Sequence, residues 1–166
     1  MTTMTKQEAL ELVRKDGFQL EHLDRRFRDN EEIVLEAVAG DGISLKYASP
    51  RLRDSEEMIL KALESHPYAL EFASNRLKDD AEFVLDAIRI SPRNLEHASE
   101  RLRDDEDVVL AAVSRNWSAY DYASERLKRS EEILEAFCES SNWSLGEILI
   151  QFLPEGRLTA GILFGI

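Results

Sequence analysis

The chain repeats itself every 25 residues through its middle, without an insertion or deletion in four copies. The regular copies occupy residues 31–55, 56–80, 81–105 and 106–130, with a weaker copy at 6–30 and a degenerate one from residue 131. A fixed period of this size is typical of a solenoid, in which each unit covers the apolar face of its neighbour. We therefore expect a single all-α domain over residues 1–166, an α-solenoid of five to six units with residues 131–166 as its C-terminal cap.

The first half of each unit is an apolar segment that we expect to form a longer helix. Residues 33, 34, 35, 37 and 38 are Ile, Val, Leu, Ala and Val, and the same columns are apolar again from Phe83 to Ile88. Apolar residues nearly all round a short helix indicate burial between neighbours, so Leu85 is expected in the core. An aspartate before each segment has Glu or Asp three residues later, a variant of the capping box. The predicted N-caps are Asp29, Asp54, Asp79 and Asp104.

The second half of each unit is predicted to form a shorter helix and one tight helical turn. The shorter helix follows a cap at Asp41 or Asn116 in two units and begins with Pro67 or Pro92 in the other two. A serine follows a recurrent alanine, and Pro50 after the first such serine would break a continuous helix. The serines are therefore predicted to cap a separate helical turn, and they are Ser49, Ser74, Ser99 and Ser124.

Three stretches of these units carry a resemblance to a known family. They are Phe83-Val84-Leu85-Asp86-Ala87-Ile88, Ala69-Leu70-Glu71-Phe72-Ala73-Ser74, and Leu45-Lys46-Tyr47-Ala48-Ser49 with Leu52 and Asp54. Over about residues 6 to 130 the chain resembles the bacterial tandem repeats called domain of unknown function 4116. The resemblance implies helical repeats with no assigned activity, often accessory parts of larger bacterial proteins, some of them secreted into host cells. Arg129 departs from the pattern because it stands in the aspartate column.

The formal net charge of -12 limits the partners that the surface attracts. An acidic surface repels phosphate backbones and anionic lipid headgroups, so we expect neither nucleic acid nor a membrane as a partner. No stretch reaches the run of about 18 apolar residues that a membrane span needs. The single cysteine, Cys138, cannot form an intrachain disulfide and favours a reducing compartment. We expect the cytoplasm, either of a bacterium or of a host cell into which the protein is delivered.

The titratable residues form no pattern typical of an active site. His22, His66 and His97 stand in different units, too far apart along a solenoid to share a metal ion. Cys138 has no His or Lys nearby in sequence to activate it, and no glycine-rich phosphate loop is present. We therefore expect no catalytic residue, no metal site and no cofactor, and a protein that is not an enzyme.

Two basic residues recur near the end of each unit, and we call them the basic ladder. Stacking of the units would align them into a stripe that binds an acidic or phosphorylated partner. The interpretation that we favour is structural: each pair neutralises the acidic start of the next unit. The candidate residues are Arg51, Arg53, Arg76, Lys78, Arg101, Arg103, Arg126 and Lys128.

The turn between the two helices varies in sequence while the rest of the unit stays fixed. Loops along one edge of a solenoid commonly carry recognition, and Tyr, Trp and Arg dominate the energetics of many interfaces. A second interpretation has equal support: the aromatic residues of these turns only cover the ends of their own helices. The candidate binding edge, called the turn edge below, consists of Tyr68, Arg93, Arg115, Trp117 and Trp143. A neighbouring column is predicted to be core and contains Tyr47, Phe72, His97 and Tyr122.

The C-terminal end from Leu145 to Ile166 is apolar, although a last repeat normally needs a polar outer face. Three interpretations stay open: a cap that folds back, a homodimer interface, or the cut edge of a longer protein. For the whole chain we expect a non-catalytic module for protein interaction or scaffolding, with a protein as its partner. The alternative is a regulatory or substrate-docking segment of a larger bacterial protein, for example an effector.

Overall fold

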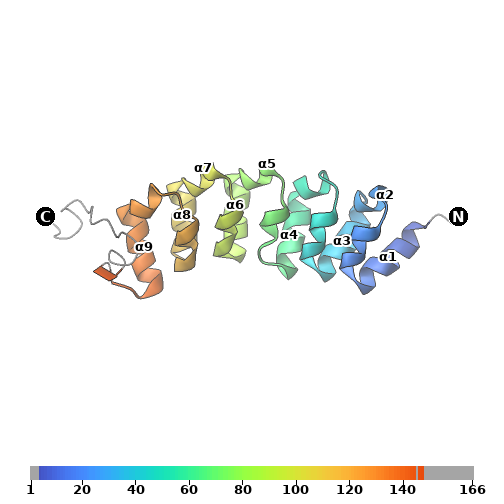
Figure 1. Ribbon diagram of the computed structural model, residues 1–166, viewed down its shortest axis with the longest axis horizontal. Coiled ribbons are helices and arrows are strands. Elements are labelled where there is room, and N and C mark those ends of the chain that lie inside the picture. Colours follow the sequence, from blue (N-terminus) through green and yellow to red (C-terminus); the bar gives the residue numbers. More distant parts are fainter. Residues whose placement is uncertain (1–3, 145, 148–166) are drawn as a thin grey trace.

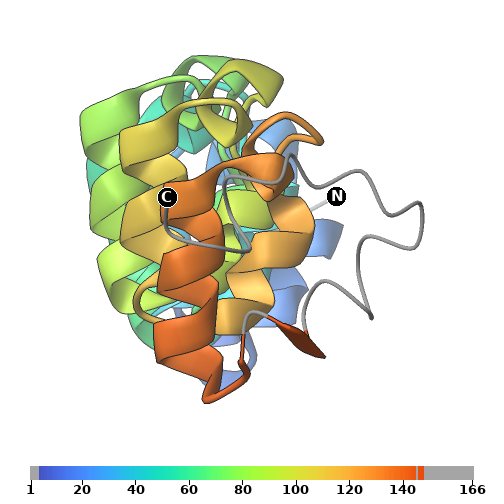
Figure 2. The ribbon, with the colours of Figure 1, turned by 90° about the vertical axis from the view of Figure 1, so that its left-hand side faces the viewer.

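The computed structural model describes residues 4–144, 146 and 147 and shows an elongated stack of helical units (Figure 1). The chain progresses from one end of the stack to the other, so its described termini lie far apart. Seen along the stack, the units lie one behind another (Figure 2). Each of the first five units follows the predicted order of a long helix, a short helix and a helical turn. The expected all-α solenoid is therefore confirmed.

The long helices pack side by side, each against the next. They are α1 (Lys6–Lys15), α3 (Glu31–Gly40), α4 (Glu56–Ser65), α6 (Ala81–Ile90), α8 (Glu106–Val113) and α9 (Glu131–Ser141). The short helices are 3₁₀ helices, namely η1 (Gly17–His22), η2 (Gly42–Tyr47), η4 (Ala69–Phe72), η5 (Pro92–His97) and η6 (Trp117–Tyr122). The helical turns are α2 (Arg25–Arg28), η3 (Leu52–Asp54), α5 (Asn75–Lys78), α7 (Glu100–Arg103) and η7 (Leu127–Arg129).

The short 3₁₀ helix η2 is held by a hydrogen bond at each of its ends. In η2 the Asp41 carboxylate accepts a hydrogen bond from the Ile43 amide at 3.0 Å, so the predicted cap is confirmed. At the other end the extended residue Ala48 donates to the carbonyl three residues back, at 3.0 Å. Bonds from i to i+3 close in a shorter segment than those of an α-helix. Pro92 begins η5 as predicted. Pro67, in contrast, lies in a turn before η4, and the prediction that it begins the short helix was wrong.

The core is a continuous layer between the long helices and the 3₁₀ helices. In the second regular unit Ile59, Leu63 and Leu70 are all fully buried. The prediction that Leu85 belongs to this core was wrong in degree, because its side chain is only partly buried. Its counterpart in α4, Leu60, is 37% exposed. Neighbouring helices and the 3₁₀ layer cover only part of each long helix, and the fifth position faces the uncovered side.

The long helices begin one residue later than predicted. The side chains of Asn30, Asp80 and Asp105 accept hydrogen bonds from amides three residues on, at 3.2, 3.2 and 3.3 Å. Ser130 stands at the N-cap of α9, but its hydroxyl donates to Glu106 at 2.9 Å and does not cap the helix. The predicted caps were wrong for Asp29, Asp54, Asp79 and Asp104, because the next unit binds their carboxylates.

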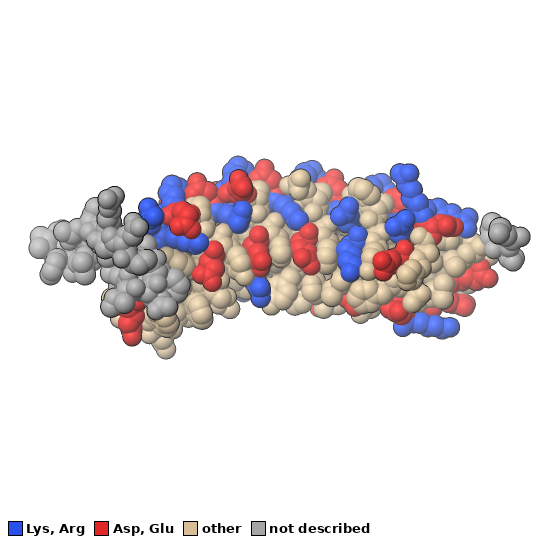
Figure 3. All heavy atoms as spheres, in the orientation of Figure 1, with Lys and Arg blue, Asp and Glu red and all other residues tan. Residues whose placement is uncertain are grey.

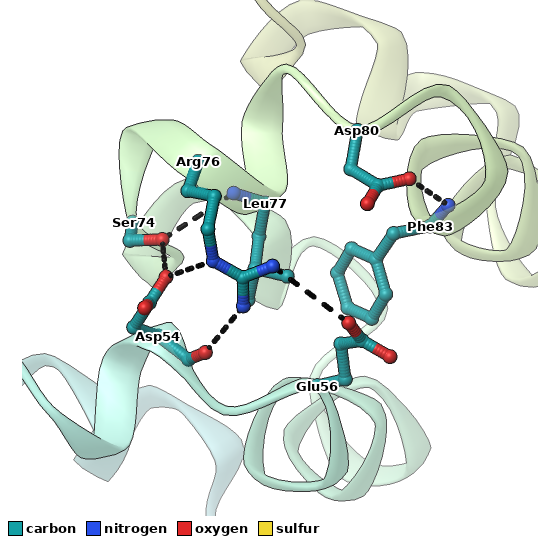
Figure 4. A network of polar contacts seen from close by, with 7 residues as sticks. All are labelled: Asp54, Glu56, Ser74, Arg76, Leu77, Asp80 and Phe83. Atoms are coloured by element: carbon teal, nitrogen blue, oxygen red, sulfur yellow. Dashed lines mark hydrogen bonds and ion pairs between the residues drawn. The ribbon is translucent and has the colours of Figure 1, made fainter.

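Asp54 shows how this binding works (Figure 4). The Ser74 hydroxyl donates to the Asp54 carboxylate, and Arg76 Nε donates to the same oxygen at 2.9 Å. Arg76 Nη2 also donates to the Asp54 main-chain carbonyl at 2.9 Å. Ser74 in turn accepts a hydrogen bond from the Leu77 amide at 3.3 Å and so caps α5, as predicted. We call this set of Asp, Ser and Arg the inter-unit clamp, because it joins two consecutive units.

The inter-unit clamp recurs at each of the four junctions from the first unit to the fourth regular one. Its members are Asp29, Ser49 and Arg51; Asp54, Ser74 and Arg76; Asp79, Ser99 and Arg101; and Asp104, Ser124 and Arg126. At the next junction the sequence has Arg129 in the aspartate column, with Leu149 and Gln151 in the serine and arginine columns. The three clamp residues therefore occur together or are replaced together. Arg129 departs from the aspartate column because the sequence after it has no serine and arginine in those columns to bind an aspartate there.

The apolar end predicted to form a cap or a homodimer interface lies mostly outside the described residues, which include only Gly146 and Glu147 of it. Its three interpretations therefore stay predictions. Within residues 4–144, 146 and 147, no helix is both long and apolar enough to span a lipid bilayer.

Candidate binding surface

The turn edge lies where each long helix ends and the chain turns into its 3₁₀ helix. In η1 and η6 the side chains of Asp16 and Asn116 accept hydrogen bonds from amides two residues on, at 3.0 and 2.9 Å. These local bonds fix the turns without using the following side chains, which are left to face solvent. Tyr68, Trp117 and Trp143 are 38%, 44% and 41% exposed. Such exposure of large aromatic side chains is unusual for residues that serve only as core.

Tyr68 and Arg93, from consecutive units, meet on this edge. The Arg93 guanidinium carbon lies 5.4 Å from the centroid of the Tyr68 ring, within the range of a cation–π interaction. Arg93 Nε also forms an ion pair with Glu96 at 3.2 Å. Behind them, His66 packs edge-to-face on Tyr68 at 5.9 Å and stacks on Phe72 at 6.0 Å. Two predicted edge residues are thus held together by a supporting layer of rings.

Trp117 and Trp143 both pack against Phe137, which is buried in α9. The ring of Trp117 is 5.8 Å from that of Phe137, and the ring of Trp143 is 6.4 Å from it, both edge-to-face. Tyr120 packs on the same phenylalanine from the core, at 4.9 Å. The two tryptophans therefore cover the last part of the core and still expose more than a third of their surface. Trp143 thus covers its own helix α9, whereas Trp117 covers a helix of the next unit, and binding by either residue stays a prediction.

Arg115 has a structural contact on the turn edge. Its Nη2 donates to the carbonyl of Arg89, near the end of α6, at 3.1 Å. The last carbonyls of a helix lack partners within that helix, and a cation is favourable beside them. Arg115 thus ties the end of α8 to that of the preceding long helix, and its guanidinium is already engaged.

Sequence reasoning missed a third contact group, formed by Phe18, Lys46 and Tyr47 at the N-terminal end of the edge. The rings of Phe18 and Tyr47 pack edge-to-face at 6.4 Å. Lys46 Nζ lies 5.7 Å from the Phe18 ring and 4.7 Å from the Tyr47 ring. The column predicted as core is only partly buried, although three of its members still pack against the core; it contains Tyr47, Phe72, His97 and Tyr122. The available signal was that Phe18 stands in the same column as Tyr68 and Arg93, two residues of the predicted turn edge.

The charge of this surface at neutral pH comes from its arginine, lysine and carboxylate groups. Burial lowers the pKa of His97, so the imidazole is neutral at physiological pH. Burial also raises the pKa of Tyr122, so the phenol keeps its proton. Arg93, Lys46 and Glu96 therefore supply fixed charges among the aromatic rings. The edge combines apolar rings with a few polar groups, which is the composition of many protein interfaces.

The basic ladder is largely engaged within the fold. Its first members, Arg51, Arg76, Arg101 and Arg126, belong to the inter-unit clamps and pair with the preceding unit, not with the next helix. Among the second members, Lys78 Nζ donates to the Glu71 carbonyl at 2.7 Å, and Lys128 pairs with Glu125 at 3.0 Å. Figure 3 shows basic and acidic residues alternating along the edge above α5 and α7. The acidic residues therefore neutralise the positive charge of the basic ladder locally.

From the aspartates of the inter-unit clamps we predict how the stability of the folded chain depends on pH. The hydrogen bond from Ser74, with Arg76 beside it, lowers the pKa of Asp54, and the other three clamp aspartates have lowered pKa values for the same reason. A lowered pKa stabilises the folded chain above the unfolded pKa of about 4, and this stabilisation disappears as the pH falls through the folded pKa. We expect the Tm from circular dichroism to be nearly constant between about pH 5 and 7 and to fall below about pH 4.

A double variant, Asp54→Asn with Asp79→Asn, is the control for this prediction. It removes two titrating carboxylates and leaves side chains of similar size. We expect a lower Tm at pH 7 and a smaller decrease on acidification than in the unsubstituted protein. An equal decrease in both proteins would show that other carboxylates cause the acid sensitivity.

In the described part of the chain, no group of three or more His, Cys, Asp or Glu side chains is placed to hold a metal ion. Burial raises the pKa of the Cys138 thiol, so the thiol stays protonated at neutral pH.

Comparison with known proteins gives one match, to a family. The family model described as "Domain of unknown function (DUF4116)" matches three consecutive segments, residues 6–53, 55–103 and 105–155. Each match covers about two of the 25-residue units, and together they span most of the chain. Neither the curated proteins nor the solved structures include a match to the chain.

Proposed function

Since the chain belongs to the DUF4116 repeat family, whose description gives no function, we propose that it is a non-catalytic module for protein interaction. Its partner binds along the turn edge. The observation that carries this proposal is the row of exposed aromatic side chains on that edge, where Tyr68, Trp117 and Trp143 each expose more than a third of their surface. The single cysteine supports a reducing compartment, the cytoplasm of a bacterium or of its host.

The spacing of the contact groups supports a long, extended partner surface. The groups around Phe18, Tyr68 and Trp117 come from different units, and adjacent helices are about 8 to 10 Å apart. The inter-unit clamps fix the positions of these units relative to one another, so the contact groups lose little conformational freedom when a partner binds. Pre-organisation of this kind strengthens binding because it lowers the entropic cost of association.

Replacing Tyr68 and Trp117 together by alanine tests the proposal. We expect the double variant to lose capture of the partner from a cell lysate by more than about tenfold, since aromatic anchors often contribute 2 kcal/mol or more each. Capture is measured by mass spectrometry on the immobilised protein. The far-UV circular dichroism spectrum at room temperature should stay unchanged, because neither side chain belongs to the buried core, while the Tm should fall slightly because the Trp117 ring no longer covers Phe137.

The control is Asn75→Ala with Glu100→Ala, which removes two exposed side chains from the edge formed by α5 and α7. We expect this variant to capture the partner as well as the original protein does. The turn edge would be excluded as the binding surface if the aromatic variant captured the same proteins at the same level.

A further inference from the structure

The outer side of the long helices carries a row of leucines that the fold leaves partly uncovered. They stand at the fifth position of four consecutive helices, and Leu60 is the most exposed of them, at 37%. The other three pack only partly against the core. We call this set the leucine row, and it consists of Leu35, Leu60, Leu85 and Leu110.

Carboxylates flank the leucine row. A groove between α3 and α4 is lined by Leu35 and Ala39, with Glu31, Glu32, Glu36, Glu57 and Lys61 around them. The five long helices from α3 to α9 contain 14 acidic residues against two basic ones, Lys61 and Arg89. This excess equals the net charge of -12 of the whole chain, so the rest of the molecule is neutral overall.

Some of these carboxylates are paired within the fold and others are not. Lys6 and Arg14 of α1 pair with Glu32 and Glu36, which neutralises one end of the surface. Further along, Glu57, Glu82 and Asp107 are exposed and form no ion pair within the described part of the chain. The free acidic groups thus lie at the second position of α4, α6 and α8, near the leucine row.

We propose that the leucine row and its carboxylates dock a basic amphipathic helix of a protein partner, which crosses the long helices along the stack. Charge complementarity selects a cationic partner, since phosphate backbones and anionic lipids are repelled. A helix rises about 10.5 Å over seven residues, close to the 8 to 10 Å between neighbouring long helices. An apolar residue every seventh position therefore meets one leucine after another, with Lys or Arg beside it facing the carboxylates.

This surface is separate from the turn edge, and its proposal does not rest on the proposed function. The probe is a fluorescent peptide of about 18 residues, made of leucine and lysine in a heptad pattern, about 27 Å long as a helix. A second, scrambled peptide has the same numbers of leucine and lysine in an order that spreads the leucines around the helix, which gives no apolar helical face. By fluorescence anisotropy we expect the heptad peptide to bind at least about tenfold more tightly, and binding to weaken as salt is added.

Two sets of variants locate the binding surface. Leu60→Ser, and separately Glu57→Gln with Glu82→Gln and Asp107→Asn, should each weaken binding of the heptad peptide about tenfold. The charge-matched control is Glu21→Gln with Glu100→Gln and Asp121→Asn, three exposed acids outside the long helices, and it should change binding less than about twofold. The turn-edge variant Tyr68→Ala with Trp117→Ala should bind the peptide normally.

Three results would each overturn the proposal. The first is equal binding of the heptad and scrambled peptides, which would mean that the peptide is attracted by charge alone. The second is that the control triple variant weakens peptide binding as much as the triple variant of the long helices does. This would mean that the overall negative charge of the protein attracts the peptide, whichever surface carries it. The third is loss of peptide binding in the turn-edge variant, which places the peptide on the other surface. None of these results affects the test of the turn edge itself, because that test uses a different ligand.

Discussion

Replacing Leu63 by alanine is expected to lower the free energy of unfolding by about 2 to 5 kcal/mol. Leu63 is fully buried in α4, between the neighbouring long helices and the 3₁₀ layer. Truncation removes buried methyl groups and leaves a cavity that the surrounding helices fill only in part. Because each unit contacts only its neighbours, the loss should appear both in chemical denaturation and as faster amide hydrogen exchange around α4.

The same substitution at Leu60 is the matched control, in the same helix and three residues away. Leu60 is 37% exposed, so its replacement by alanine should cost about 1 kcal/mol or less. Equal losses at the two positions would mean that the assigned outer face of α4 is wrong. They would also remove the basis for the leucine row as a docking surface.

Replacing Gly42 by alanine is expected to destabilise the fold by about 1 to 3 kcal/mol, through overpacking. A Cβ atom at residue 42 would lie 2.4 Å from the carbonyl oxygen of Ala62 and 2.7 Å from Cβ of His66. Both atoms belong to the next unit, and the carbonyl is part of the backbone of α4, so it has no rotamer change by which to move away. The two units would have to separate at this point, and the Tm should fall accordingly.

Gly40→Ala is the control for this substitution, only two residues away. Nothing lies within 4 Å of a Cβ built at residue 40, and the residue is the last of α3. Alanine has the higher helix propensity, so we expect a gain of up to about 1 kcal/mol. If both alanine variants changed stability by the same amount and in the same direction, steric contact between units would not be the cause.

These contacts between units bear on both binding proposals. The turn edge and the leucine row each take side chains from several consecutive units, so their spacing depends on how the units are joined. The inter-unit clamps, with Ser74 and Arg76 on one carboxylate, fix that junction from the edge of α5 and α7. The close approach of Gly42 to Ala62 fixes it from the turn edge. A change at either point should therefore weaken binding of a partner that spans several units.

The sequence predicted some parts of the candidate surfaces and missed others. It identified Tyr68, Arg93 and Trp117 because the columns of the turn vary among otherwise fixed units, and the structure places all three on the surface. It missed Lys46 and Tyr47, since a column of Tyr, Phe and His resembles a core position until its exposure is known. It treated Leu85 as buried because the helix is apolar on several sides, and composition alone does not say which side a neighbour covers.

The sequence by itself determined the period, the order of helices within a unit and the deepest core positions. Leu63, Leu70 and Leu77 follow from spacing because each unit must bury its own apolar face, and that requirement is local. Only the tertiary structure decided that Asp54 binds Ser74 and Arg76 instead of capping α4, and that Leu60 faces solvent. Both depend on the rotation of one unit relative to the next. That rotation is set by packing between residues about 25 positions apart, which spacing within a single unit does not encode.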